Sequence, residues 1–145
     1  MRWLDATTLF VTLLMCGTEL TVSAFIYPAV WKHNSQAMAG EFARVMGKVM
    51  PVWYPLCLVL LGAEAYLRRQ EPGHTFLFAA AILWAAVIVY TLTMLVPLNN
   101  RVASISEGAA VPDWVAISRK WDTLHRLRTA LLLLAVALFY GGLQP

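Results

Sequence analysis

Four long apolar stretches, separated by short polar segments, constrain this sequence more than any other feature. The third, residues 75–96, contains no charged side chain and is long enough for an α-helix to cross the hydrocarbon core of a bilayer. With 60% hydrophobic residues, 13% charged residues and a mean hydropathy of +0.65, the chain lies far from the composition of soluble domains. We therefore predict an all-α integral membrane four-helix bundle, a single transmembrane domain over residues 1–145.

The predicted spans cover about residues 6–28, 49–67, 75–96 and 125–141, and the last helix extends back to about residue 113. Pro28 should end or kink the first span, because proline lacks the amide hydrogen that a continuing helix uses. The Pro97-Leu98-Asn99-Asn100-Arg101 turn should end the third span. Residues 32–47 are amphipathic rather than spanning. We expect this segment, between helices 1 and 2, to lie on the membrane surface or to fold back into the bundle.

The basic residues are divided unequally between the two ends of the predicted bundle. The end with the chain termini and the 67–74 turn has Arg2, Arg68 and Arg69. The other end has Lys32, Arg44, Lys48, Arg101, Arg119, Lys120, Arg126 and Arg128. The positive-inside rule therefore places the two long loops in the cytoplasm, and we expect the bacterial inner membrane. No basic run interleaved with aromatics suits a nucleic acid, which we exclude as a partner.

The first span has one polar face. On a helical wheel, Thr8, Thr12, Glu19, Ser23 and Tyr27 fall within a single wedge. A carboxylate within a span is costly unless it faces the bundle interior and finds a partner there. Glu19 is thus a candidate functional residue, although a structural hydrogen bond or a protonated, buried carboxyl would also account for it.

The fourth helix carries a stripe of functional groups. Trp121, His125, Arg128 and Leu132 occur at i, i+4, i+7 and i+11, so they share one face that should turn toward the bundle. Anchoring at the headgroup level is the alternative explanation for the tryptophan and the arginine.

Other polar residues have local explanations. Glu64 has Arg68 four residues later, and Asp122 has Arg126, which is the spacing of a helical ion pair. His74 belongs to the opposite turn, where we expect it to be solvated.

The polar residues on the long-loop side should converge on one pocket. We assign catalysis to Glu19, His125 and Arg128, and substrate binding to His33, Arg44, Asn99, Arg101 and Trp121. Such a pocket offers a base, imidazoles and guanidinium groups able to hold an oxyanion. This combination suits proton abstraction from an acidic organic substrate.

Metal chemistry is an alternative without a motif. Glu19, His33 and His125 are possible metal ligands, and the two histidines are possible axial ligands of a haem, but their spacing matches no known ligand signature. Cys16 and Cys57 lie in apolar stretches without a partner spacing. A haem, copper or quinone-binding redox protein and a non-catalytic accessory subunit of a larger membrane complex therefore remain open alternatives.

Three features together resemble a known family: Pro28 after the first span, the Pro97-Leu98-Asn99-Asn100-Arg101 turn, and Trp121-x3-His125-x2-Arg128 leading into the last span. The chain is similar over nearly its whole length to the anthrone oxygenase-like family of small four-helix membrane proteins, formerly a family of unknown function. Some fungal members oxidise anthrones to anthraquinones with oxygen, whereas most bacterial relatives have no assigned role.

The resemblance implies a membrane-embedded oxidoreductase, a cofactor-independent oxygenase acting on a lipid-soluble aromatic or enolisable substrate. His125 or Glu19 would remove an acidic proton, Arg128 or Asn99 would hold the resulting oxyanion, and oxygen would attack the carbanion. No cofactor is required in this interpretation. The expected partners are the bilayer and a small lipid-soluble molecule, with a homo-oligomer or a larger membrane complex possible.

Overall fold

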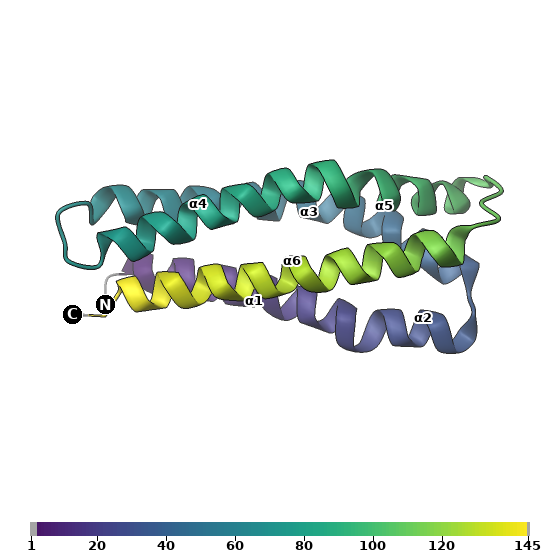
Figure 1. Ribbon diagram of the computed structural model, residues 1–145, viewed down its shortest axis with the longest axis horizontal. Helices are drawn as coiled ribbons and strands as arrows, with labels where there is room; N and C mark the ends of the chain where they lie inside the picture. The colour runs from purple at the N-terminus through teal and green to yellow at the C-terminus, as the bar shows by residue number, and fades with distance from the viewer. Residues whose placement is uncertain (1–2, 145) are drawn as a thin grey trace.

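The computed structural model describes residues 3–144, and every regular element within them is helical, which confirms the predicted all-α fold. Four long helical segments run alternately up and down the bundle (Figure 1). They comprise α1 (Trp3–Thr21), η1 (Val22–Ile26) and α2 (Tyr27–His33); α3 (Gln36–Leu67); α4 (His74–Tyr90), η2 (Thr91–Leu95), α5 (Val96–Ala103) and η3 (Ser104–Glu107); and α6 (Trp114–Gly142).

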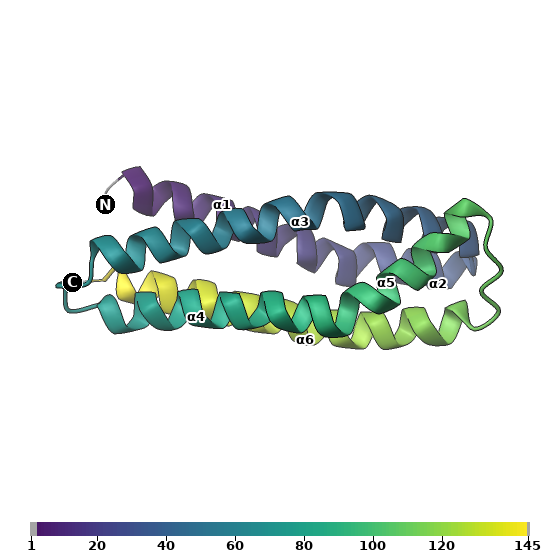
Figure 2. The same ribbon diagram turned by 90° about the horizontal axis from the view of Figure 1, so that it is seen from above.

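Segments that are consecutive in the chain are neighbours in space. α3 packs between α1 and α4, and α6 closes the ring against α4 and α1. Both ends of the described chain lie at the same end of the bundle as the turn between α3 and α4, whereas the α5–α6 loop lies at the other end (Figures 1 and 2). α3 and α6 therefore occupy diagonal positions, with the interior of the bundle between them.

All four helical segments are long and apolar enough to cross a membrane, and the protein is an integral membrane protein. Its outer surface carries large apolar side chains, as expected where lipid rather than water is the solvent. Examples are Phe10, Phe25, Val52, Val59 and Ile82. The limits of the spans within these helices and the cytoplasmic side of the long loops stay predictions.

The helix does not end at Pro28, where the sequence predicted an end or a kink, or at Pro97, where it predicted an end. Each proline follows a π-helical turn by two residues, η1 before Pro28 and η2 before Pro97, and the helix continues beyond it. A proline ring collides with the carbonyl four residues earlier in a regular α-helix. The wider π turn displaces that carbonyl, so the chain stays helical through the proline.

Most of the amphipathic segment 32–47 is the first part of α3, continuous with the second span, rather than a separate surface helix. α2 ends at His33, and its C-cap residue Asn34 has a φ of 46°, in the left-handed region that asparagine tolerates. Ser35 then caps α3 by accepting a hydrogen bond from the Met38 amide at 3.2 Å. The polar residues of this segment therefore extend the bundle beyond its apolar part.

A charged cluster closes the end of the bundle near the chain termini. Arg68 bonds to Asp5 at 2.7 Å and to Glu71 at 2.8 Å, and its Nε lies 3.5 Å from Glu64. The predicted Glu64–Arg68 pair is therefore present. Arg68 ties the end of α3 to the start of α1.

The turn between α3 and α4 touches the last residues of α6, and this contact requires glycine. A Cβ at Gly73 would overlap the Gly142 carbonyl oxygen, whereas a Cβ at Gly62 would have no atom within 4 Å. We expect Gly73→Ala to destabilise the bundle by about 1–3 kcal/mol, the usual cost of overpacking. Gly62→Ala is the control and should be neutral or stabilising, because alanine favours the helix. Thermal unfolding in detergent measures both, and equal midpoints would contradict the contact.

Candidate functional site

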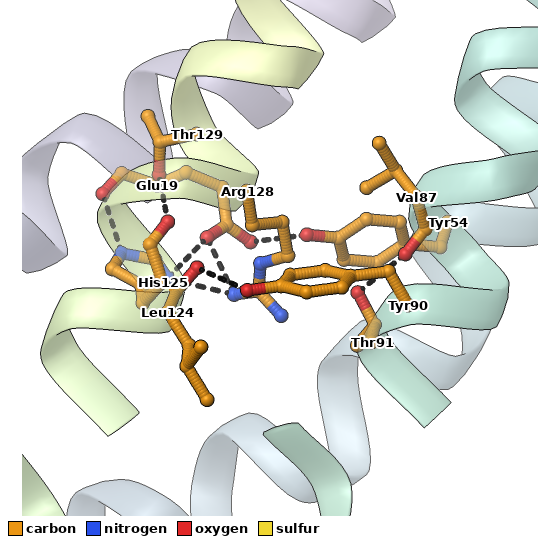
Figure 3. A network of polar contacts seen from close by, with 9 residues as sticks. All are labelled: Glu19, Tyr54, Val87, Tyr90, Thr91, Leu124, His125, Arg128 and Thr129. Carbon is orange, nitrogen blue, oxygen red and sulfur yellow. Dashed lines mark hydrogen bonds and ion pairs between the residues drawn. The ribbon is translucent and has the colours of Figure 1, made fainter. Parts of the chain in front are cut away.

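Glu19 lies at the centre of the bundle, fully buried, with partners from two other helices (Figure 3). Tyr54 of α3 donates its hydroxyl hydrogen to Oε1 at 3.0 Å. Arg128 of α6 donates from Nη2 to Oε2 at 2.7 Å. His125 Nδ1 lies 3.1 Å from the same oxygen. A buried carboxylate is tolerated only when charge and hydrogen bonds compensate it, and here a guanidinium supplies the charge.

The two ring nitrogens of His125 have different roles. Nε2 lies 3.1 Å from the backbone carbonyl oxygen of Glu19, and because a carbonyl can only accept, Nε2 carries a hydrogen. Nδ1 lies 2.8 Å from Arg128 Nη2 and accepts from it when the ring is neutral. When Nδ1 is protonated, it donates instead to the Glu19 carboxylate. Nδ1 therefore faces the carboxylate and the guanidinium, whereas Nε2 bonds to the backbone.

Aromatic rings hold this polar group in place. Trp121 stacks between Tyr27, at 5.0 Å between ring centroids, and His125, at 4.6 Å. The Arg128 guanidinium carbon lies 5.4 Å from the Tyr54 ring centroid and 5.8 Å from that of Trp121. These stacking and cation–π contacts fix the side chains on α6, where regular helical spacing brings them to one face.

Two side chains of α4 donate hydrogen bonds to backbone carbonyl groups of the neighbouring helices α6 and α3. Tyr90 donates to the Leu124 carbonyl at 3.2 Å, and Trp84 donates to the Tyr54 carbonyl at 3.2 Å (Figure 3 shows Tyr90). The π turn η1 begins three residues after Glu19 and interrupts the regular helical bonding beside it. Such π turns occur frequently at functional sites.

A cavity of about 290 Å³ adjoins this group. Its buried wall comes from α1, η1 and α6 and includes Glu19, Val22, Trp121, His125 and Arg128. Its other wall comes from α3, α4, η2 and α5. Several residues of this wall also reach the outer surface: Gly47, Pro51, Pro55, Leu92 and Asn100. Most of the lining is apolar. The cavity therefore places a charged group at the deep end of an apolar space that lies nearest to lipid along α3 and η2.

The structure brings together five of the eight residues that the sequence proposed for the site. The cavity is lined by Glu19, Asn99, Trp121, His125 and Arg128. Asn99 also donates from Nδ2 to the Ala43 carbonyl at 2.9 Å, which joins α5 to α3.

The other three predicted residues lie outside the cavity. His33 is exposed at the end of α2. Arg44 pairs with Glu41, and Arg101 pairs with Asp113 at 3.0 Å on the surface. Helical rotation explains the difference, because these side chains lie at the correct end of the bundle but point away from its interior.

Sequence reasoning missed Tyr54, the partner of Glu19 on α3. The signal for it was the proline pair in Pro51-Val52-Trp53-Tyr54-Pro55, which places two helix-incompatible residues and a phenol within one turn of a span. Pro51, Tyr54 and Pro55 all line the cavity.

The residues do not fit the metal alternatives. Within residues 3–144, no three His, Cys, Asp or Glu side chains form a group that could hold a metal ion, so His33 does not complete a set with Glu19 and His125. As a haem ligand His125 is also unsuited, since both ring nitrogens already bond within the protein.

Two buried donors on residues that line the cavity have no hydrogen-bond partner in the described part of the chain. They are the Nε of Arg128 and the Nε1 of Trp121. Buried donors are normally satisfied, so an acceptor oxygen of a ligand that reached these N–H groups would supply the missing partner.

The chain is similar in sequence to known proteins. The family described as "Anthrone oxygenase" matches residues 42–138, which include Tyr54, Trp121, His125 and Arg128. An anthrone oxygenase of Claviceps purpurea (strain 20.1) is 25% identical over 145 aligned residues, which cover 90% of this chain and 82% of the relative. No solved structure matches the chain.

The ion pair at the site generates a stability prediction. Arg128→Leu should destabilise the protein by about 3–5 kcal/mol, because it leaves the Glu19 carboxylate buried without its cation. The double variant Glu19→Leu/Arg128→Leu should regain much of that loss. Arg44→Leu, which breaks the exposed pair with Glu41, is the control and should change little. Unfolding midpoints in detergent measure the cycle, and additive losses in the double variant would contradict the coupling.

Proposed function

Because this chain belongs to the anthrone oxygenase family, we propose that it is a membrane-embedded oxygenase acting on a lipid-soluble aromatic substrate with an enolisable carbonyl group. The observation that carries the proposal is the Glu19–His125–Arg128 group at the deep end of an apolar cavity. A carboxylate, an imidazole and a guanidinium in a water-poor space are the groups that carbanion chemistry needs.

The first step is removal of a proton from the carbon that carries the acidic C–H bond. Glu19 takes this proton, and His125 Nδ1, 3.1 Å from Oε2, receives it from the carboxyl group. His125 can take this role because its Nε2 hydrogen is already committed to the Glu19 carbonyl. Arg128 and Trp121 then stabilise the enolate oxygen with the Nε and Nε1 hydrogens that have no partner within the described chain.

Oxygen adds to the carbanion in the second step. The carbon–oxygen bond formed gives a hydroperoxide after protonation by His125. Glu19 then removes the second hydrogen of the same carbon as a proton, and the electron pair of that C–H bond forms the carbonyl group as the O–O bond breaks. The leaving hydroxide takes up this proton and becomes water. The substrate CH₂ group supplies all four electrons that reduce O₂, so the proposed sequence involves no redox cofactor.

The bilayer serves as the reservoir of substrate in this proposal. The cavity lies nearest to lipid between α3 and η2, where Pro55 and Leu92 line it and are also exposed on the outer surface. A small lipid-soluble molecule dissolved in the membrane would thus reach Glu19 without crossing the polar long-loop end.

We expect purified protein in detergent to consume O₂ with a hydroxylated anthrone and to form the corresponding anthraquinone. With ¹⁸O₂, one labelled atom should enter the product and the other should enter water. Glu19→Gln and His125→Ala should each lower kcat by about 10²–10⁴, the range for loss of a general base. Oxygen electrode and mass spectrometry measure these outcomes.

His74→Ala is the matched histidine control, because His74 is exposed at the opposite end of the bundle, and it should keep the activity. Full turnover by the Glu19→Gln/His125→Ala double variant would exclude the assigned roles. Binding of quinones without oxygen uptake would favour a quinone-binding protein instead. A Soret band in the purified protein would favour a haem protein.

A further inference from the structure

Three residues of α3 lie on one face of the helix, and this face forms part of the cavity wall. Gly47, Pro51 and Pro55 are spaced four apart, and all three line the cavity. In a regular helix, the amide of residue i+4 bonds to the carbonyl of residue i. Proline has no amide hydrogen, so the carbonyl groups of Gly47 and Pro51 have no such donor.

Other carbonyls of α3 do receive side-chain donors. Asn99 donates to the carbonyl of Ala43 at 2.9 Å, and Trp84 donates to that of Tyr54 at 3.2 Å. Within residues 3–144, no side chain donates a hydrogen bond to the carbonyl of Gly47 or Pro51. Backbone acceptors without donors are unfavourable in an apolar setting, and near lipid no water is present to satisfy them.

The diagonally opposite helix presents the complementary groups. On α6, Arg128 Nε and Trp121 Nε1 are donors without partners in the described chain. Apolar side chains such as Ile88 and Leu95 line the space between the two walls. A ligand that forms hydrogen bonds with both walls is therefore planar or narrow. It has an acceptor oxygen at one edge and a hydrogen-bond donor at the other.

We propose that Pro51 and Pro55 are specificity-determining residues, whose effect is to leave the Gly47 and Pro51 carbonyl groups available to accept a hydrogen bond from a hydroxyl group of the ligand. The oxygen that becomes the enolate faces Arg128 and Trp121, and the hydroxyl group lies on the ring edge remote from it. The choice of a tricyclic aromatic ligand rests on the proposed function, whereas the donor requirement rests on the two prolines.

The test measures binding rather than turnover and uses two ligands of nearly the same shape. 2-Hydroxyanthraquinone donates a hydrogen bond, and 2-methoxyanthraquinone cannot. We expect the detergent-purified protein to bind the hydroxy compound about tenfold more tightly, at a pH that keeps the phenol protonated, because unpaired polar groups discriminate against an analogue that lacks the donor. Quenching of tryptophan fluorescence or isothermal titration gives the two Kd values.

The variants Pro51→Ala and Pro55→Ala restore the missing amides, so each should lower the hydroxy-to-methoxy preference, and the double variant should bring it close to one. Alanine is favourable in helices, so these variants should fold. Pro28→Ala is the control, because Pro28 also lies within a helical segment but does not line the cavity, and it should keep the wild-type preference.

Three results would overturn the proposal: no preference in the wild-type protein, the same preference in the Pro51→Ala/Pro55→Ala double variant, or an equal loss in Pro28→Ala. Failure of the proposed function has a different signature. A proline-dependent preference without oxygen uptake would retain this inference and reject the oxygenase. Oxygen uptake with no preference between the two ligands would retain the oxygenase and reject this inference.

Discussion

The carboxylate of Glu19 imposes the constraint on which the bundle depends. In a bilayer, a buried negative charge must be compensated by groups from the protein itself, because no water is available to solvate it. Its partners are Tyr54 on α3 and His125 and Arg128 on α6, so one group ties three of the four helical segments together. The packing of these helices around Glu19 is a condition for burying the charge, and the cavity beside it is the space that this packing leaves.

Periodicity within single helices was enough to predict four residues of the site. Glu19 and the stripe of Trp121, His125 and Arg128 each follow from 3.6-residue spacing, and both faces are buried as expected. Tyr54 did not follow, because the part of α3 around it, residues 49–63, is apolar on all sides and its sequence does not indicate which face turns inward. That orientation is set by contacts with other helices, which a single sequence does not display.

The same limitation explains the predicted residues that lie outside the cavity and the predicted helix ends. His33 and Arg101 were assigned by their end of the bundle, but depth along a helix does not determine direction around it. Pro28 was expected to end or kink the first span and the Pro97 turn to end the third, yet a π turn before each proline lets the helix continue. Proline chemistry indicates that a regular α-helix cannot pass unchanged, but it does not specify whether the chain stops, kinks or forms a π turn.

The irregular elements of the bundle gather around the cavity, and this has a chemical consequence. η1 follows Glu19 on one wall of the cavity, and η2, Pro51 and Pro55 lie on the other wall. A regular transmembrane helix offers a ligand no backbone acceptors, because all of them are used within the helix. Prolines and π turns are the means by which such a helix exposes polar backbone to an apolar interior. In the proposed function, the charged wall of α1 and α6 carries out proton transfer, while α3 supplies recognition without introducing a second charge into the membrane.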